Sequence, residues 1–167
     1  MTQNILCMSD EESEMFFEVN NAIKFISESN TIEGIHRSPK KGEIKEYLRF
    51  MALEAITIEE LQRFVSVYQP NAKLRDNVGM NVRVGNYRPM AGGPAVKAEL
   101  EHMLKHLEAK YHNNPHKVHK EYETLHPFTD CNGRSGRMLW RWMMRDKPLA
   151  PLGFLQTWYY QSLEEGR

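Results

Sequence analysis

Twelve consecutive residues, HPFTDCNGRSGR at positions 126–137, combine side chains that suit phosphate chemistry. A helix is expected to begin at Asn132-Gly133. The free N–H groups at a helix start, together with the positive end of the helix dipole, form an anion site. Arg134 and Arg137 lie three residues apart on one face of this first turn. Two guanidinium groups at such a position predict a pocket for more than one phosphate group.

Asp130 and His126 add a reaction to this anion site. The Asp130 carboxylate would repel a phosphate, and a divalent cation between them removes the conflict, because Mg²⁺ prefers oxygen ligands. His126 carries the only nearby side chain that ordinarily titrates near neutral pH, so it could take a proton from an attacking hydroxyl. These residues predict nucleotidyl or phosphoryl transfer. Spacing alone leaves a second interpretation open, in which the segment is a capped turn with surface arginines.

The elements that must position these residues are mostly helices, since apolar residues recur with a period near 3.6. Ser9 with Glu12, and Thr57 with Glu60, match the capping-box pattern at a helix start. Helices are expected at about 10–33, 42–54, 58–68, 94–112 and 114–125, from about 132 onward, and at about 152–164.

One stretch departs from helical spacing. Residues 81–88, NVRVGNYR, alternate apolar and polar side chains around Gly85-Asn86, which favours a two-residue hairpin turn. The open edge of such a hairpin could accept a peptide as an added strand. The expected fold class is therefore mainly α with one short β-hairpin.

Composition excludes several classes of protein. The 167 residues suit one domain, and Lys+Arg and Asp+Glu number 22 each, so no net charge favours nucleic acid or an acidic membrane. No run of 18 apolar residues is present, and the first residues lack the basic and apolar regions of a secretory signal. Two cysteines are too few for a disulfide framework. We expect a reduced, cytoplasmic protein without a nucleic-acid or membrane partner.

The segment HPFTDCNGRSGR resembles the signature H-P-F-x-[D/E]-G-N-G-R-x-x-R of the Fic (filamentation induced by cAMP) family. Every specified position agrees except Cys131, where the family usually has glycine. The GNYR sequence, His119 seven residues before His126, and the pair Tyr159-Tyr160 extend the likeness over about residues 29–165. The resemblance implies a single Fic domain over residues 1–167 with a mostly helical Fic-type core.

The resemblance also implies an activity, the transfer of AMP from ATP to a Tyr, Thr or Ser hydroxyl of a target protein. In the implied roles His126 is the general base and Asp130 holds Mg²⁺ or Mn²⁺ on the α- and β-phosphates. The implied nucleotide-binding residues are Asn132, Gly133 and Arg134 at the α- and β-phosphates, Arg137 at the γ-phosphate, and Tyr160 at the adenine.

Residues of about 81–93 match the family's flap, which aligns a target segment beside the active site. Its implied target-binding residues are Gly85, Asn86, Tyr87 and Arg88. The flap is short, because two prolines and two glycines crowd its return strand. Cys131 is the other departure, since its β-carbon stands where glycine allows an unusual φ.

Residues 29–34, SNTIEG, match a second family pattern, [S/T]-x-x-x-E-[G/N], which marks an inhibitory helix, here at about 10–34. Glu33 lies in the last helical turn, where its charge opposes the helix dipole, so a tertiary role is indicated. A solvated surface carboxylate is the alternative. The resemblance implies that Ser29 and Glu33 are inhibitory and that Glu33 pairs with Arg137 and excludes the γ-phosphate. In some members the same glutamate supports removal of AMP from targets.

Other functions stay open. A Cys131 thiol with a lowered pKa beside two arginines could pair with His126 in acyl transfer, although Asp130 would then have no role. The fold could also bind a nucleotide without catalysis, or transfer another phosphate-containing group. Phosphotransferase relatives replace the second glycine of the motif with lysine, so Gly133 favours AMP transfer. His102 and His106 could start a metal site, but a solvated histidine face is the simpler interpretation. A homodimer is left open.

Overall fold

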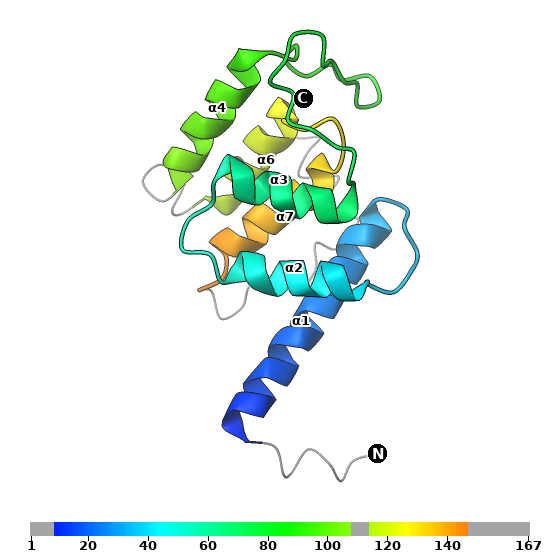
Figure 1. Cartoon of the computed structure of the whole chain (residues 1–167), viewed down its shortest axis with the longest axis vertical. Helices are drawn as coiled ribbons and strands as arrows, with labels where there is room; N and C mark the ends of the chain where they lie inside the picture. Colours follow the sequence, from blue (N-terminus) through cyan, green and yellow to red (C-terminus); the bar gives the residue numbers. More distant parts are fainter. Residues whose placement is uncertain (1–8, 108–113, 147–167) are drawn as a thin grey trace.

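The structure, a computed structural model, describes residues 9–107 and 114–146 (Figure 1). Those residues form six helices, and the protein is mainly α, as the helical spacing predicts. The helices are α1 (Asp10–Ile32), α2 (Lys41–Met51), α3 (Ile58–Tyr68), α4 (Pro94–Lys105), α6 (Pro115–Leu125) and α7 (Asn132–Met143). The predicted ranges for α3 and α6 agree closely, whereas α2 ends before residue 54 and α4 before residue 112. The predicted helix at 152–164 lies outside the described residues.

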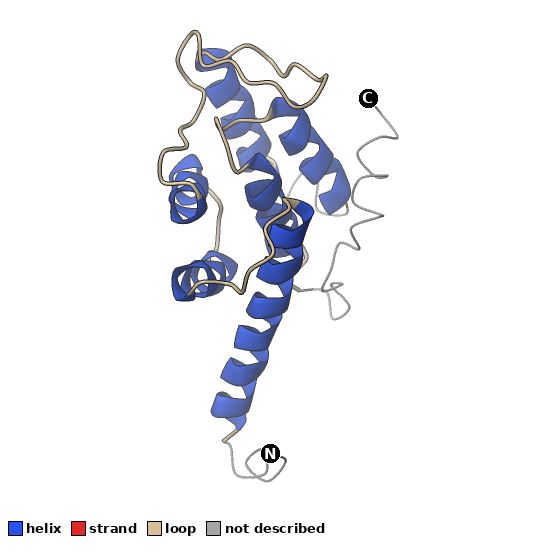
Figure 2. Ribbon diagram, turned by 90° about the vertical axis from the view of Figure 1, so that its right-hand side faces the viewer, coloured by secondary structure: helices blue, strands red, loops and turns tan. Residues whose placement is uncertain are grey.

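The central helix is α7, which packs against α1, α2, α3 and α6, while α4 covers the other side of α6. Figure 2 shows α2 and α3 end-on beside this core. Met138, Leu139, Trp140 and Trp142 of α7 are all buried. The first turn of α7 is therefore fixed by a well-packed helix. No helix in the described part of the chain is both long and apolar enough to cross a bilayer.

Helix α1 begins as predicted, with a capping box in which Ser9 Oγ accepts from the Glu12 N–H and the Glu12 carboxylate accepts from the Ser9 N–H. Its first half projects beyond the other helices (Figures 1 and 2), and Met15 and Phe16 are 63% and 58% exposed. The apolar side chains of α1 are thus buried only in its second half, at Ala22, Phe25, Ile26 and Ile32, while Ile23 is 36% exposed. Amphipathic spacing identifies a helix without specifying how much of its length is covered.

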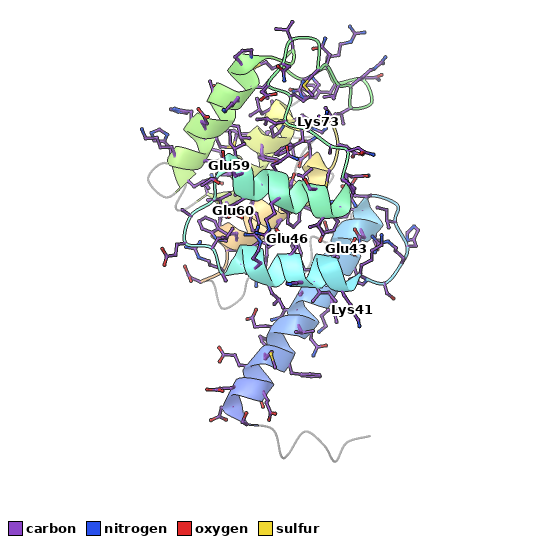
Figure 3. All side chains as sticks on the ribbon, in the orientation of Figure 1. Lys41, Glu43, Glu46, Glu59, Glu60 and Lys73 are labelled. Atoms are coloured by element: carbon purple, nitrogen blue, oxygen red, sulfur yellow. The ribbon has the colours of Figure 1, made fainter. Side chains whose placement is uncertain are left out.

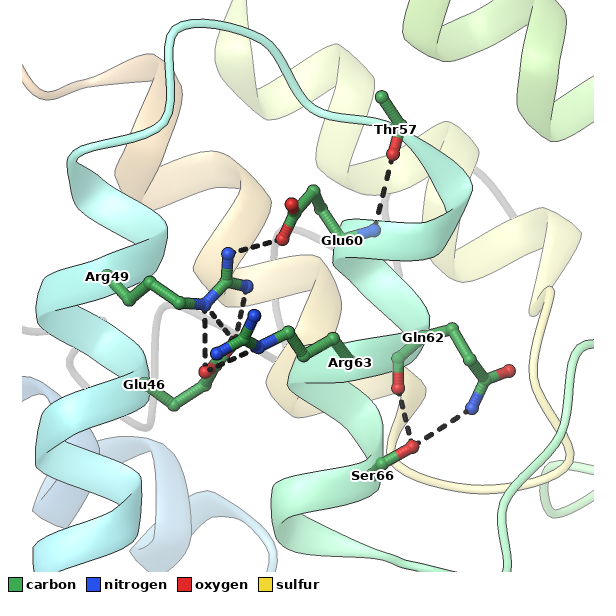
Figure 4. A network of polar contacts seen from close by, with 7 residues as sticks. All are labelled: Glu46, Arg49, Thr57, Glu60, Gln62, Arg63 and Ser66. Atoms are coloured by element: carbon green, nitrogen blue, oxygen red, sulfur yellow. Dashed lines mark hydrogen bonds and ion pairs between the residues drawn. The ribbon is translucent and has the colours of Figure 1, made fainter.

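A polar network joins α2 to α3 (Figure 4). The Arg49 guanidinium pairs with the Glu46 carboxylate of its own helix and with Glu60 of α3. At the start of α3, Thr57 Oγ1 accepts from the Glu60 N–H at 3.3 Å, as predicted, but the Glu60 carboxylate turns to Arg49 instead of completing the capping box. Figure 3 labels the glutamates of these two helices, Glu43 and Glu46 of α2 and Glu59 and Glu60 of α3, of which Glu43 and Glu46 are buried. The network holds α2 against α3, and both helices also pack against α7.

The predicted hairpin is reduced to its turn. Val84 and Tyr87 form one antiparallel bridge around Gly85-Asn86, with both backbone hydrogen bonds at 2.9–3.0 Å, and no longer strand occurs among the described residues. Gly85 has a φ of +57°, which a turn with glycine in its first central position requires. Pro89 has no N–H group, and the Gly92 N–H donates to the Asn81 side chain instead of a strand partner. These two features end the ladder after one pair.

Candidate active site

A six-residue loop, 126–131, joins α6 to α7 and carries the predicted chemistry. Phe128 is fully buried beneath it and pairs with Leu74 in an antiparallel bridge. The Asn132 side chain closes the loop, since its Oδ1 accepts from the Phe128 N–H and its Nδ2 donates to the Phe128 carbonyl, both at 2.8 Å. Phe128 belongs to the hydrophobic core. The polar atoms of the Asn132 side chain are engaged within the loop itself.

Two loop residues have a left-handed backbone, His126 with φ 52° and Cys131 with φ 68°. This conformation crowds Cβ against the following carbonyl in L-residues, and glycine adopts it without that penalty. The departure from glycine at position 131 is therefore accommodated by strain. The lowered thiol pKa expected there is wrong: burial raises the pKa of Cys131 to about 12, because desolvation outweighs the nearby Arg134 and Arg137. This result weakens the Cys–His acyl-transfer alternative.

His126 is half-buried and caps the end of α6, where its N–H donates to the Tyr122 carbonyl. Its ring Nδ1 lies 3.3 Å from the Glu123 carbonyl oxygen. A carbonyl can only accept, so this contact favours the proton on Nδ1 and leaves the lone pair on Nε2. A general base acting through Nε2 needs this tautomer.

Arg137 is 99% buried and is bound by the end of α1. Its Nε donates to Ser29 Oγ at 2.9 Å, and one terminal nitrogen donates to the Ser29 carbonyl at 3.0 Å and to Glu33 Oε1 at 2.5 Å. We call these three residues the Arg137 clasp. The Glu33 side chain is 36% exposed, so water reaches one partner of the ion pair. The predicted pairing of Glu33 with Arg137 is present in the structure.

Gly133 lies directly beside the clasp, in the first turn of α7. A Cβ at this position would stand 2.3 Å from Glu33 Oε1. The carboxylate is therefore in close contact with bare backbone at the positive end of the helix. An anion already occupies the position that the sequence predicts for a phosphate group.

Arg134, predicted to face the phosphates, lies inside the fold. It is 5% exposed, its guanidinium carbon stands 5.2 Å from the centre of the Tyr68 ring, and its Nε has no hydrogen-bond partner within the described residues. Arg134 and Arg137 share a helix face as expected, but their guanidinium groups have different neighbours. Arg134 supplies a buried positive charge behind the first turn of α7.

Asp130 is exposed at the end of the loop, and its Oδ1 accepts from the Cys131 N–H at 2.5 Å. A solvent-accessible carboxylate beside an anion site fits a hard cation such as Mg²⁺, which binds proteins through few carboxylates and keeps several waters. The rings of His102 and His106 have centres 4.4 Å apart and planes tilted by 40°. Within ranges 9–107 and 114–146 no three His, Cys, Asp or Glu side chains gather as a metal site.

The flap lies against the end of α6. The Tyr87 hydroxyl donates to the Thr124 carbonyl at 2.9 Å, two residues before His126, while Arg88 at the end of the turn is exposed. A cavity of about 660 Å³ lies between the flap, α4 and α6, and its lining includes Tyr87, Met90, Met103 and Leu125. The sequence did not predict this cavity, because its walls come from three separate segments. Tyr160 lies outside the described residues.

One further residue of the site escaped the sequence prediction. Arg75, in the segment after α3, is fully buried, and its guanidinium donates to the His126 carbonyl at 2.7 Å. It belongs to no periodic pattern and to no motif used above. The signal that could have found it is an arginine directly after an apolar residue in a segment that leads into the flap.

No curated protein matches the chain. The family model of the Fic/DOC family matches residues 47–144, which is more than half of the chain. The matched segment begins within α2 and contains the flap, the loop 126–131 and all of α7. The chain belongs to the Fic/DOC family.

Proposed function

We propose that this protein is an adenylyltransferase, which transfers AMP from ATP to a Tyr, Thr or Ser hydroxyl of a target protein and is inhibited by its own Glu33. Members of the Fic/DOC family are generally transferases. The observation that carries the proposal is the Glu33 carboxylate, which rests on Gly133 and Arg137 at the start of α7. A site that binds a carboxylate through a helix terminus and a buried guanidinium suits phosphate oxygens.

The proposed reaction assigns one step to His126. The target hydroxyl oxygen attacks the α-phosphorus of ATP, and the bond from that phosphorus to the oxygen bridging to the β-phosphate breaks. His126 Nε2 takes the hydroxyl proton, and the products are the AMP ester of the target and pyrophosphate. The Nδ1 contact with the Glu123 carbonyl orients the ring for this transfer.

Binding and orientation fall to the start of α7. The backbone N–H groups around Gly133 bind the α- and β-phosphates, and Arg137 binds the γ-phosphate once Glu33 has withdrawn. Asn132 holds the loop through Phe128, so we assign its side chain to loop geometry and its backbone to phosphate binding. Asp130 would hold Mg²⁺, which supplies charge neutralisation at the phosphates when bound. Arg134 adds positive charge from within the fold.

The decisive experiment removes the Glu33 charge. The purified protein is incubated with Mg-ATP, and intact-mass spectrometry measures AMP added to the protein itself. A coupling free energy of about 1–3 kcal/mol between Glu33 and the γ-phosphate would raise the rate about 5–150-fold in Glu33→Gln and Glu33→Gly. Glu14→Gln, an exposed carboxylate on the same helix, is the matched control and should equal the wild type.

The two Glu33 variants separate charge from helix fraying. If only Glu33→Gly is faster, the weakened last turn of α1 is the cause, and the charge is not. His126→Ala in the Glu33→Gly background should lose at least 10²-fold of the rate and still bind ATP. No AMP transfer by either Glu33 variant, with ATP bound, would leave a nucleotide-binding module as the better function.

A further inference from the structure

Arg75 makes an unusual set of contacts for an arginine. Its side chain is fully buried, and within the described residues it has no ion-pair partner. All the hydrogen bonds of its guanidinium group go to backbone carbonyls. Burial lowers the pKa of Arg75, as expected for a desolvated cation. Carbonyl dipoles stabilise this charge where a carboxylate would normally do so.

Those carbonyls belong to two different parts of the site. Nε donates to the His126 carbonyl at 2.7 Å, and one terminal nitrogen donates to the Leu125 carbonyl at 2.9 Å. The other terminal nitrogen donates to the carbonyls of Met90 at 2.8 Å and Met80 at 3.3 Å. One half of the guanidinium therefore binds the end of α6 with the predicted base, and the other half binds both ends of the flap.

The backbone of Arg75 repeats the same connection. Its N–H donates to the Pro127 carbonyl at 2.8 Å, and its carbonyl accepts from the Gly93 N–H at 2.9 Å. Two residues before Arg75, the Lys73 carbonyl accepts from the Thr129 N–H at 2.9 Å. Residues 73–75 thus run between the loop 126–131 and the end of the flap at Gly93, and they bond to both.

His126 depends on this arrangement in particular. Its backbone is left-handed, a conformation that persists only where the surroundings hold it. The hydrogen bond from Arg75 Nε holds the His126 carbonyl in place. It thereby restrains the backbone of His126, to which the imidazole is attached. The Tyr87 hydroxyl, bonded to the Thr124 carbonyl, ties the flap to the same helix end.

We propose that Arg75 is a positioning residue, which holds His126 and the flap as one unit so that the base and the target segment keep a fixed separation. This inference rests on the proposed function for its catalytic meaning, while its structural content stands on the contacts above. Lysine cannot replace arginine here, because only the planar guanidinium presents donors in fixed directions to four carbonyls.

The first test does not depend on AMP transfer. Amide hydrogen exchange is measured for the full chain carrying Arg75→Met, Arg75→Lys or Arg141→Met. Arg141 is the matched control, a buried arginine of α7 whose Nε donates to the Tyr47 hydroxyl of α2. Arg75→Met should speed exchange at least tenfold in both 76–93 and 124–129 and leave α2 within twofold. Arg141→Met should leave the exchange rates of both segments, 76–93 and 124–129, within twofold of the wild type.

Faster exchange in only one of the two segments, or an equal increase throughout the chain, would overturn the proposal, since Arg75 would then be an ordinary core residue. Arg75→Lys retains the charge but can bond to fewer of the carbonyls. Its exchange rates in the two segments should lie between those of the wild type and Arg75→Met. Should Arg75→Met fail to fold, Arg75→Lys decides by the same comparison.

The second test uses the Glu33→Gly background and self-modification with Mg-ATP. Arg75→Met should lower kcat at least tenfold and leave the KM for Mg-ATP within twofold, because Arg137 and the start of α7 are untouched. Retained kcat would refute the positioning role and spare the proposed function. Coupled exchange in a parent protein that transfers no AMP would refute the proposed function and spare the role of Arg75 in the structure.

Discussion

Replacing Cys131 with glycine should stabilise the protein relative to alanine at the same position. Cys131 has a φ of 68° and is 5% exposed. A left-handed L-residue costs about 1–2 kcal/mol relative to glycine in the folded state. Glycine also lowers the free energy of unfolding by about 0.4–1 kcal/mol, because it gives the unfolded chain more conformational freedom. Both variants lose the same buried thiol, so the difference is about 1 kcal/mol in favour of glycine.

A control position must show the opposite sign. Ala98 is an exposed residue in the middle of α4, and Ala98→Gly should cost about 0.8–1 kcal/mol because glycine is a poor helix former. Urea unfolding followed by circular dichroism gives the free energies, and each difference corresponds to about 2–4 °C in Tm for a chain of this size. All measurements are made without nucleotide.

The sign of the difference in unfolding free energy between Cys131→Gly and Cys131→Ala tests whether the loop is strained at position 131. If Cys131→Gly is no more stable than Cys131→Ala, while Ala98→Gly is destabilised as expected, the loop carries no left-handed strain. The structural account of the glycine position in the motif would then be wrong.

Two further predictions concern neighbours of the loop. Gly133→Ala should destabilise the wild type much more than the Glu33→Gly variant, because the new methyl group would meet the Glu33 carboxylate. The expected coupling in a double-mutant cycle is about 0.5–3 kcal/mol. Additive free energies of unfolding would show that the carboxylate lies elsewhere. Burial lowers the pKa of His119 to about 3, so its ionisation leaves the unfolding free energy unchanged above about pH 6.5 and lowers it as the pH falls from 6.5 toward 3, where only the unfolded state binds the proton. His119→Gln should reduce the pH dependence of unfolding free energy by up to about 1.4 kcal/mol per pH unit in that window, and an unchanged slope would contradict the buried neutral state.

The helices could be predicted because their signals are local. Apolar spacing together with Thr57 fixed the start of α3, and Asn114-Pro115 fixed the start of α6. The contact between Glu33 and Arg137 followed from the resemblance of two short motifs to those of the Fic family, while the charge that opposes the helix dipole indicated only a tertiary role for Glu33. The residues that signal each helix start stand close together in sequence, and Glu33 and Arg137 each lie within a short motif.

The features that escaped prediction depend on distant neighbours. The Cys131 thiol is beside two arginines in sequence, yet burial sets its pKa, and burial depends on how α3 and α7 pack. Arg75 bonds to carbonyls about 50 residues away, and a carbonyl acceptor has no residue type that a sequence could display. The Glu60 carboxylate had a plausible local partner in Thr57 and instead bonds across to α2.

The two halves of the Arg137 clasp are separated by more than one hundred residues of chain. Synthesis from the N-terminus therefore completes Ser29 and Glu33 long before the loop and α7 exist. The carboxylate at the anion site is also supplied at a fixed ratio of one per site, since both lie on a single polypeptide. A tether of this kind gives the carboxylate a high effective concentration that dilution of the protein does not change.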